Sequence, residues 1–425
     1  MRELLAIIEG QVIGRVLQDR FGKLSFSYDD AWRKSAEAFP ISLSMPMRQT
    51  DHGDEQVSAF LWGLLPDNDR VLERWASHFQ VSARNPFALI SHIGEDCAGA
   101  IQFVRPDRQE QFRDEPTSSE VQWLSEAQVA ERLARLRADH SAWRLARDHG
   151  QFSLAGAQPK TALLFQNGRW GVPSGRTPTT HILKPPTGEW DGHAENEHFC
   201  LELAASMNLI AARTMVQSFR DEIAIVIERY DRLPRSSGFV RVHQEDMCQA
   251  LSISPARKYE SDGGPNVGRI AGLLRIESSR PEEDIRAFLN SVAFNWLIAG
   301  TDAHAKNYSI LIGARGSVRF APLYDVASIL PYPNIFVPKL KMAMKIGGHY
   351  DLRMIGLRQW RRVAAEIRVP EEELIAGLRS MAAELPDQIA SVKRRIDREL
   401  RHPVLCRLAQ VLTQRAKECA KALES

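Results

Sequence analysis

Asp302 and Asn307 stand in a D-x-x-x-x-N spacing, and Asp325 follows eighteen residues after Asn307. In phosphoryl transfer to a hydroxyl group, one carboxylate accepts the hydroxyl proton, while an amide oxygen and a second carboxylate hold Mg²⁺. Two metal ligands on different segments allow the ion to bridge the β- and γ-phosphates of ATP. The spacing therefore indicates the chemistry of a kinase.

The residues beside these positions differ from those of common eukaryotic-type kinases. Gly300 and Thr301 stand where His-Arg precedes the aspartate in those enzymes, and Val326 and Ala327 stand where Phe-Gly follows the second one. An ordinary eukaryotic-type protein kinase is thus disfavoured. Asp and Asn are also common in turns and helix caps, so the spacing needs support from the rest of the chain.

A loop of small residues precedes an apolar, strand-like segment upstream. The loop, Ser153–Lys160, reads SLAGAQPK and leads into Thr161–Phe165. Small side chains let backbone N–H groups approach phosphate oxygens, although a tight turn before a strand is the alternative. Pro159 has no N–H to offer, so the loop as a whole is a better candidate than any single contact within it.

A short β-branched run ends at Lys184, just before two prolines. Lys184 is a candidate for pairing the α- and β-phosphates, and a solvated lysine at a strand end is the alternative. The next segment has apolar residues at helical spacing and acids in its first turn. Glu195 or Glu197 is expected to pair with Lys184, and both are equally expected as helix N-terminal acids. Glu222–Arg232 reads as a buried strand leading into a polar hinge, the place where a kinase contacts adenine.

Six segments resemble the HipA family in their residues and order: Ser153–Thr161, Thr180–Lys184, Glu228–Arg232, Gln244–Ala250, Lys258–Pro265 and Thr301–Asn307. HipA proteins are serine/threonine-protein kinase toxins of bacterial toxin–antitoxin pairs. The resemblance covers most of the chain. It implies an α/β (α+β) class with a bilobal protein-kinase-like fold, an N-terminal β-rich subdomain and a mainly helical C-terminal lobe.

The resemblance also implies roles at matching positions. Asp302 would accept the proton, Asn307 and Asp325 would bind Mg²⁺, and Lys184 would hold the phosphates. Ser153 matches a serine that the family autophosphorylates, and a turn hydroxyl bonded to its own backbone is the alternative. Contacts with ATP are expected from Ala155, Gly156, Ala157, Gln158, Pro159, Lys160, Lys184, Glu228, Arg229, Tyr230, His304, Ala305, Lys306, Asn307, Tyr324, Asp325, Val326 and Ala327.

Partners follow from the same resemblance. A HipB-like helix-turn-helix antitoxin is expected, with operator DNA reached through the antitoxin complex, and an aminoacyl-tRNA synthetase as the protein substrate. Lys393–Arg395, Arg398 and Arg401 form a basic cluster, which is either a solvated helix face or a phosphate contact. The net charge of +2 gives little support for nucleic-acid binding by the chain as a whole.

Composition is that of a large globular enzyme. The chain has 425 residues, which is long enough to form two or three hydrophobic cores. Of these residues, 44% are hydrophobic and 25% are charged. It lacks both an apolar run of about 18 residues and a leader-like N-terminus, so we expect no membrane association and a cytoplasmic location. The five cysteines are scattered without C-x-x-C spacing, which predicts buried thiols rather than a zinc site or disulfides.

The expected organisation has four parts: a β-rich N-terminal subdomain at 1–104, a polar linker at 105–120, a kinase N-lobe at 121–231 and a mainly helical C-lobe at 232–425. Apolar residues at i, i+3 and i+4 predict helices at Asp284–Ile298 and Glu371–Leu385. A period of two predicts a strand at Lys339–Ile346.

Three functions fit these features. The first is an active toxin that uses Mg²⁺ and ATP to phosphorylate a translation component. The second is a catalytically weak corepressor within an antitoxin–DNA complex, and the third is a small-molecule kinase. The presence of Lys184, Asp302, Asn307 and Asp325 favours the first over the second, and the Ser153 loop disfavours the third.

Overall fold

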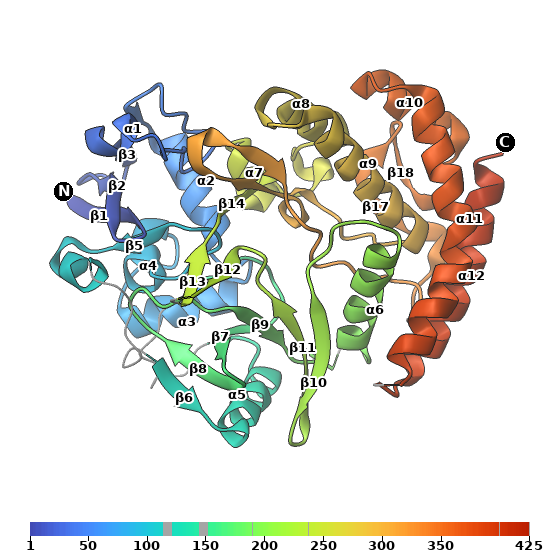
Figure 1. The fold of residues 1–425 in the computed structure, drawn as a ribbon, viewed down its shortest axis with the longest axis horizontal. Helices are drawn as coiled ribbons and strands as arrows, with labels where there is room; N and C mark the ends of the chain where they lie inside the picture. Colours follow the sequence, from blue (N-terminus) through green and yellow to red (C-terminus); the bar gives the residue numbers. More distant parts are fainter. Residues whose placement is uncertain (114–120, 144–151, 189, 237, 399, 425) are drawn as a thin grey trace. The chain divides into compact units, whose positions relative to one another are not determined.

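A computed structural model describes residues 1–113, 121–143, 152–188, 190–236, 238–398 and 400–424 (Figure 1). Residues 114–120 of the predicted linker lie outside these ranges. The chain forms two compact units, each built from several stretches of sequence. The first contains Met1–Thr187, Gln217–Ala256 and Ile310–Val318, and the second contains Gly188–Val216, Arg257–Ser309 and Arg319–Ser425.

An antiparallel sheet with the order β4-β3-β2-β1-β5 begins the first unit. Its strands are β1 (Arg2–Ile8), β2 (Gln11–Gln18), β3 (Leu24–Tyr28), β4 (Asp51–His52) and β5 (Gln102–Val104). Glu9 and Gly10 both have positive φ, the conformation that a two-residue hairpin turn needs between right-twisted strands. The β-rich character expected for the N-terminal subdomain is present in this sheet.

Helices accompany this sheet and the rest of the first unit. They are α1 (Asp30–Lys34), α2 (Asp54–Leu64), α3 (Asp69–Phe79), α4 (Pro86–Ile93), α5 (Glu126–Ala138) and α7 (Met247–Ala250), with 3₁₀ helices η1 (Pro106–Phe112) and η6 (Ala314–Gly316). Asn68 and Asn85 cap α3 and α4 through their side-chain oxygens. Phe112 of η1 is buried against Leu5, Ile7 and Val104, so this part of the predicted linker packs onto the first sheet.

A second sheet of the first unit has the order β10-β11-β9-β7-β8-β6. Its strands are β6 (Val121–Leu124), β7 (Thr161–Gln166), β8 (Arg169–Pro173), β9 (His181–Lys184), β11 (Glu222–Glu228) and the end of β10 (Thr214–Phe219). Asn167 and Gly168 form the β7–β8 turn with positive φ. Leu133 of α5 packs with Leu163, Leu183 and Val226 in the core of this sheet.

Short strands complete the first unit. The strands β12 (Arg232–Arg235) and β13 (Gly238–Arg241) pair as a hairpin. A separate sheet has the order β14-β15-β16, and its strands are β14 (His243–Asp246), β15 (Ser309–Ile312) and β16 (Val318–Phe320), of which residues 310–312 of β15 and the start of β16 belong to this unit. The chain leaves the unit through the 3₁₀ turn η3 (Pro255–Arg257).

The second unit is mainly helical, as predicted for the C-terminal lobe. Its helices are α6 (His193–Ser206), α8 (Val267–Glu277), α9 (Pro281–Ile298), α10 (Leu357–Ile367), α11 (Glu371–Ile396) and α12 (Pro403–Ala422). The remaining elements are β17 (Lys341–Ile346), β18 (His349–Asp351) and the 3₁₀ turns η4 (Glu260–Asp262), η5 (Ala305–Asn307), η7 (Val337–Lys339) and η8 (Leu352–Met354). Helices α11 and α12 pack side by side (Figure 1), and Trp296 of α9 meets Trp360 of α10 with ring centroids 5.7 Å apart.

The structure shows the surroundings of the five cysteines. Cys97, Cys200, Cys248 and Cys419 are buried thiols as predicted, whereas Cys406 is exposed because it lies on the polar face of α12. Among the helices of the described ranges, none combines the length and apolar character that crossing a bilayer requires.

Candidate functional site

Asp302 is presented by a sharp turn at the end of α9. Ala299 adopts the left-handed conformation, and the Gly300 N–H donates to the Asn295 carbonyl over 2.7 Å. A Cβ on Gly300 would lie 2.3 Å from Asn295 Oδ1, so only glycine fits this close approach. The turn places Asp302 at the surface, where an acceptor can reach its carboxylate.

The loop that follows is closed by bonds to the Asp302 backbone. The Asp302 carbonyl accepts from the His304 N–H at 2.8 Å and from Asn307 Nδ2 at 2.9 Å. Because Nδ2 is used in this way, Oδ1 is the Asn307 atom that remains to bind a hard cation. Asn307 thus fixes the Asp302 backbone through its amide nitrogen, and its amide oxygen is the predicted Mg²⁺ ligand.

Tyr324 connects the segment of Asp325 to this loop. The Tyr324 hydroxyl donates to the Lys306 carbonyl over 2.7 Å and lies 2.5 Å from Ser309 Oγ. Asp325 then has a φ of 57°, a left-handed conformation in which Asp and Asn are enriched among non-glycine residues. The two predicted metal-binding segments are therefore linked one residue away from each predicted ligand.

Asn196 of α6 clamps the chain just beyond Ala327. Its Nδ2 donates to the Ser328 carbonyl at 2.7 Å, and its Oδ1 accepts from the Ser328 N–H at 3.2 Å. Glu195 and Glu197 lie on either side of Asn196 in the first turns of α6, and both are buried. The choice between them as a partner of Lys184 stays open.

In the first unit, Ser153 is buried rather than displayed. Its N–H donates to the Asp96 carbonyl over 2.9 Å, and its Oγ donates to the Leu64 carbonyl over 2.7 Å. The side chain is 0% exposed, and its hydroxyl bonds to a distant carbonyl instead of its own turn. Phosphorylation of Ser153 would require this segment to leave its position, because the side chain is enclosed.

The loop after Ser153 folds back on its own lysine. Lys160 Nζ donates to the Ala155 carbonyl over 2.6 Å and lies 5.2 Å from the centre of the Trp143 ring. Gly156 has a φ of 104°, and a Cβ there would lie 2.4 Å from Lys160 Nζ, which explains the glycine at this position. Asn68, at the start of α3, donates to the Ala157 carbonyl at 3.3 Å and fixes the tip of the loop.

Lys184 and Glu228 lie at opposite ends of one strand pair. Lys184 of β9 is opposite Ile225 of β11, and His181 is opposite Glu228. Lys184 is buried, whereas Glu228 and Tyr230 of the predicted hinge are half-buried. The register of these strands thus fixes where the lysine and the hinge stand in the first unit.

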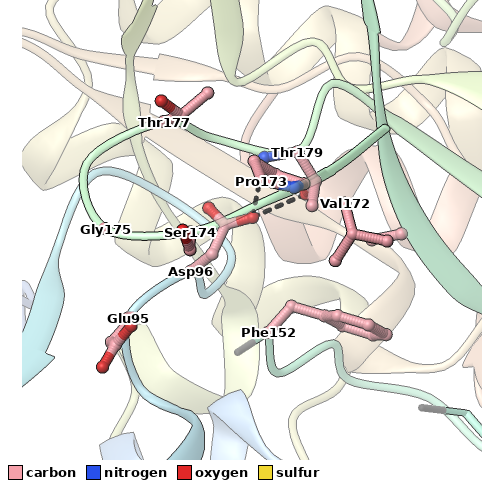
Figure 2. Close-up of a pocket in the computed structure, with 10 residues that line it drawn as sticks. Glu95, Asp96, Phe152, Val172, Pro173, Ser174, Gly175, Thr177 and Thr179 are labelled. Atoms are coloured by element: carbon pink, nitrogen blue, oxygen red, sulfur yellow. Dashed lines mark hydrogen bonds between the residues drawn. The ribbon is translucent and has the colours of Figure 1, made fainter. Parts of the chain in front are cut away.

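Arg229 of the hinge belongs to a buried network of charges. Its guanidinium donates to Asp231 at 2.9 Å and to the Thr179 hydroxyl at 2.8 Å. The Asp96 carboxylate accepts from the Thr179 N–H at 3.0 Å and the Thr179 hydroxyl at 2.6 Å (Figure 2). It also accepts from Arg232 at 2.9 Å. The side chain of Arg229 is thus used within this network, and its backbone N–H donates to the Thr180 carbonyl over 2.9 Å.

A small pocket in Figure 2 lies beside this network, between Asp96, Phe152 and Pro173. Two carboxylates line it: Asp96, whose oxygens already accept from Thr179 and from guanidinium groups, and Glu95, which pairs with Arg108. The pocket therefore offers no spare charged group to a ligand.

The predicted site residues thus form two groups, one in each unit. The Ser153 loop, Lys184 and the hinge lie in the first unit, and the catalytic and metal segments lie in the second. The sequence argument assigned no role to Asp96 or to Tyr259, whose hydroxyl lies 2.5 Å from Asp302 Oδ1. The aromatic side chain of Tyr259 in a polar, glycine-rich segment was the available signal for it.

The basic cluster near the end of α11 is partly neutralised. Lys393 pairs with Asp397, and Arg395 pairs with Glu202 at 2.6 Å. The remaining members, Arg394, Arg398 and Arg401, are exposed. In the part of the chain that the structure describes, no group of three or more His, Cys, Asp and Glu side chains forms a metal site.

Comparisons with known proteins give a consistent result. The model for the HipA-like C-terminal domain matches residues 152–389, and the model for the HipA N-terminal domain matches residues 4–104. "Putative kinase Y4mE" of Sinorhizobium fredii is 38% identical over 364 residues, which are 85% of this chain and 84% of that protein. "Serine/threonine-protein kinase toxin HipA" of Shewanella oneidensis is 29% identical over 399 residues, covering 87% and 86%.

A solved structure is similar over almost the whole length. The complex of HipA, HipB and operator DNA from Shewanella oneidensis contains a chain with a TM-score of 0.85 and 26% identity, covering 99% of this chain and 98% of that one. The mixed α/β fold expected from the sequence is thereby confirmed. With both domain models matched, the chain belongs to the HipA family.

Proposed function

We propose that this protein is a serine/threonine-protein kinase toxin that uses Mg²⁺ and ATP. The observation that carries the proposal is the link between the catalytic and metal segments. Tyr324 binds the Lys306 carbonyl, so Asp302, Asn307 and Asp325 stand on two segments joined beside the ligand positions. The names of the relatives, which are kinases and a kinase toxin, support the same function.

The proposed chemistry divides between the residues by their type. Asp302 accepts the proton of the acceptor hydroxyl, because its carboxylate is exposed and its backbone is fixed by Asn307. The Asn307 amide oxygen and the Asp325 carboxylate form the hard-oxygen donor set that Mg²⁺ prefers. Mg²⁺ and ATP would supply the phosphoryl group and neutralise charge that develops during transfer. Lys184 is assigned to the phosphates.

The other expected ATP contacts belong to this proposal. They are Ala155–Lys160 and Glu228–Tyr230 from the first unit, and His304–Asn307 with Tyr324–Ala327 from the second. Pro159 has no N–H, so we assign its contact to the neighbouring backbone of its loop. Arg229 uses its side chain and its N–H internally, so we assign its contact to its carbonyl oxygen.

Ser153 is proposed as the site of self-phosphorylation. A phosphoserine carries a charge of about −1.5 to −2 at neutral pH. This charge would lie against the Leu64 carbonyl, two residues before the Ala155–Lys160 loop that is proposed to receive phosphates, and would therefore be expelled. Modification would then displace the loop and limit the activity of the enzyme.

Growth arrest in a bacterial host tests the toxin proposal. Expression of the native chain is expected to stop growth, and Asp302→Asn should abolish the effect because it removes the proton acceptor and retains the shape of the side chain. Asp387→Asn is a matched control on the exposed face of α11 and should arrest growth as the native chain does. An Asp302→Asn chain that still arrests growth would contradict the kinase account of toxicity.

The protein substrate is proposed to be an aminoacyl-tRNA synthetase. We further propose a cytoplasmic location, and neutralisation by a HipB-like helix-turn-helix antitoxin that carries the chain onto operator DNA. The support for the antitoxin and DNA is the similarity to a chain solved in such a complex.

The alternative is a catalytically weak corepressor within that complex. The exposed arginines Arg394, Arg398 and Arg401 are its candidate phosphate contacts. Band-shift titration with antitoxin and operator separates the two functions. Asp302→Asn should leave the shift unchanged, and replacing the three arginines by glutamine should weaken it only if the chain itself contacts DNA.

A further inference from the structure

The exposed carboxylate of Asp302 has one hydrogen-bond donor among the residues that the structure describes. That donor is the Tyr259 hydroxyl, which lies 2.5 Å from Oδ1. The other polar contacts of Asp302 are made by its carbonyl, with the His304 N–H and Asn307 Nδ2. The backbone of Asp302 is therefore fixed by its own loop, but the orientation of its carboxylate depends on a residue of another segment.

Tyr259 is itself firmly placed. Its ring meets the His304 ring edge-on, with centroids 5.0 Å apart and planes at 85°. The carbonyl of the preceding residue, Lys258, accepts from the Ala305 N–H at 3.2 Å, which joins the two segments through their backbones. The ring and the backbone thus hold the phenol against the catalytic loop from two sides.

A tight turn after Tyr259 supports this placement. The Tyr259 carbonyl accepts from the N–H groups of Asp262 and Gly264 at 3.0 and 2.9 Å. A Cβ on Gly264 would lie 2.2 Å from the Arg257 carbonyl oxygen and 2.7 Å from that of Tyr259. Only glycine allows the turn to close this tightly, so the segment is built to hold Tyr259 in one position.

We propose that Tyr259 is a positioning residue for phosphoryl transfer. The phenol O–H donates to Oδ1 and stops the carboxylate from rotating, which leaves Oδ2 directed to accept the proton of the acceptor hydroxyl. A general base contributes only when it lies within hydrogen-bond reach of that proton, so its orientation affects the rate directly. Tyr259 does not touch the nucleotide in this role. The inference rests on the proposed kinase function.

The test is the initial rate of phosphate incorporation into dephosphorylated chain, measured by intact-mass spectrometry over a series of Mg²⁺–ATP concentrations. Tyr259→Phe keeps the ring contact with His304 and removes only the hydroxyl. We expect the maximal rate to fall about 10-fold, below the roughly 10²- to 10⁴-fold contribution of a general base, with the ATP concentration at half-maximal rate unchanged. Tyr350→Phe is the matched control, because Lys345 lies 5.0 Å over the Tyr350 ring and this contact persists in phenylalanine.

Thermal unfolding separates positioning from a structural effect. Tyr259→Phe should unfold close to the temperature of the native chain, because the edge-on ring contact with His304 and the backbone bonds of the turn remain. Four results would each overturn the positioning role of Tyr259. They are a native-like rate in Tyr259→Phe, an equal loss of rate in Tyr350→Phe, a change confined to the dependence on ATP concentration, and phosphate mapped to Tyr259 itself. Absence of incorporation in the native chain would overturn the kinase function and this role with it, whereas incorporation unaffected by Tyr259→Phe overturns the role of Tyr259 alone.

Discussion

Among the carboxylates of the first unit, Asp96 is the one whose replacement should lower the stability of the unit most. Its Oδ1 accepts from Arg232 at 2.9 Å and Arg241 at 3.3 Å, and its Oδ2 accepts from the Thr179 N–H and hydroxyl and from Arg229. Burial raises the pKa of Asp96, but the three guanidinium groups outweigh it and hold the pKa well below its usual range. Asp96 is therefore ionised throughout the physiological pH range.

Asp96→Asn removes this charge with little change in shape. Since both carboxylate oxygens accept from donors, the new amide NH₂ would face N–H or O–H groups in either orientation. The buried Arg229 and Arg232 would keep Asp231 as a partner, whereas the buried Arg241 would lose its ion pair with Asp96. Breaking a buried ion pair in this way costs about 3–5 kcal/mol of the free energy of unfolding. The midpoint temperature of thermal unfolding changes by roughly 2–4 °C per kcal/mol for a unit of this size, so it should fall by about 10 °C.

Circular dichroism recorded during thermal unfolding measures this change in stability, and unfolding by urea provides a second measurement. Asp30→Asn is the control in the same unit, because its side chain is 78% exposed and lies 3.7 Å from Arg33. An exposed pair of this kind contributes about 0–1 kcal/mol. A stability of Asp96→Asn within 1 kcal/mol of the native chain would refute the view that this network anchors the hinge at Arg229.

Two further predictions concern Ser153 and acid stability. Ser153→Ala should abolish self-phosphorylation, as measured by intact-mass spectrometry, and phosphate appearing elsewhere in that variant would show that the site is wrong. The variant should also lose about 1 kcal/mol of the free energy of unfolding, as measured by thermal unfolding, because the hydrogen bond to the Leu64 carbonyl is lost. Burial lowers the pKa of His243 and His198 to about 4, so the folded chain binds fewer protons than the unfolded chain between about pH 6.5 and 4. The unfolding midpoint should therefore fall as pH decreases from 6.5 to 5, where most carboxylates are still ionised, and a constant midpoint would contradict this assignment.

Local patterns in the sequence predicted the elements that carry the site. The periodicity of Asp284–Ile298 identified α9, and the two-residue period of Lys339–Ile346 identified β17, which begins two residues later at Lys341. These features depend on neighbouring residues, which is why the chain alone was sufficient for them.

Contacts between distant segments could not be predicted in this way. Asp96 meets Arg232 across 136 residues, and Tyr259 meets Asp302 across 43, so neither pair has a local pattern. The burial of Ser153 likewise depends on the Leu64 carbonyl, 89 residues earlier. Nothing in the loop sequence specifies that the hydroxyl points inward. The roles of Asp302, Asn307 and Asp325 came from spacing and family resemblance, and they remain predictions about catalysis.

The most direct test of the kinase function is intact-mass spectrometry of dephosphorylated protein incubated with Mg²⁺ and ATP. Native chain and Asp302→Asn are compared, and the modified residue is mapped by peptide sequencing. We predict a gain of one phosphate on Ser153 in the native chain and none in Asp302→Asn. No gain in the native chain, or an equal gain in both proteins, would contradict phosphoryl transfer through Asp302.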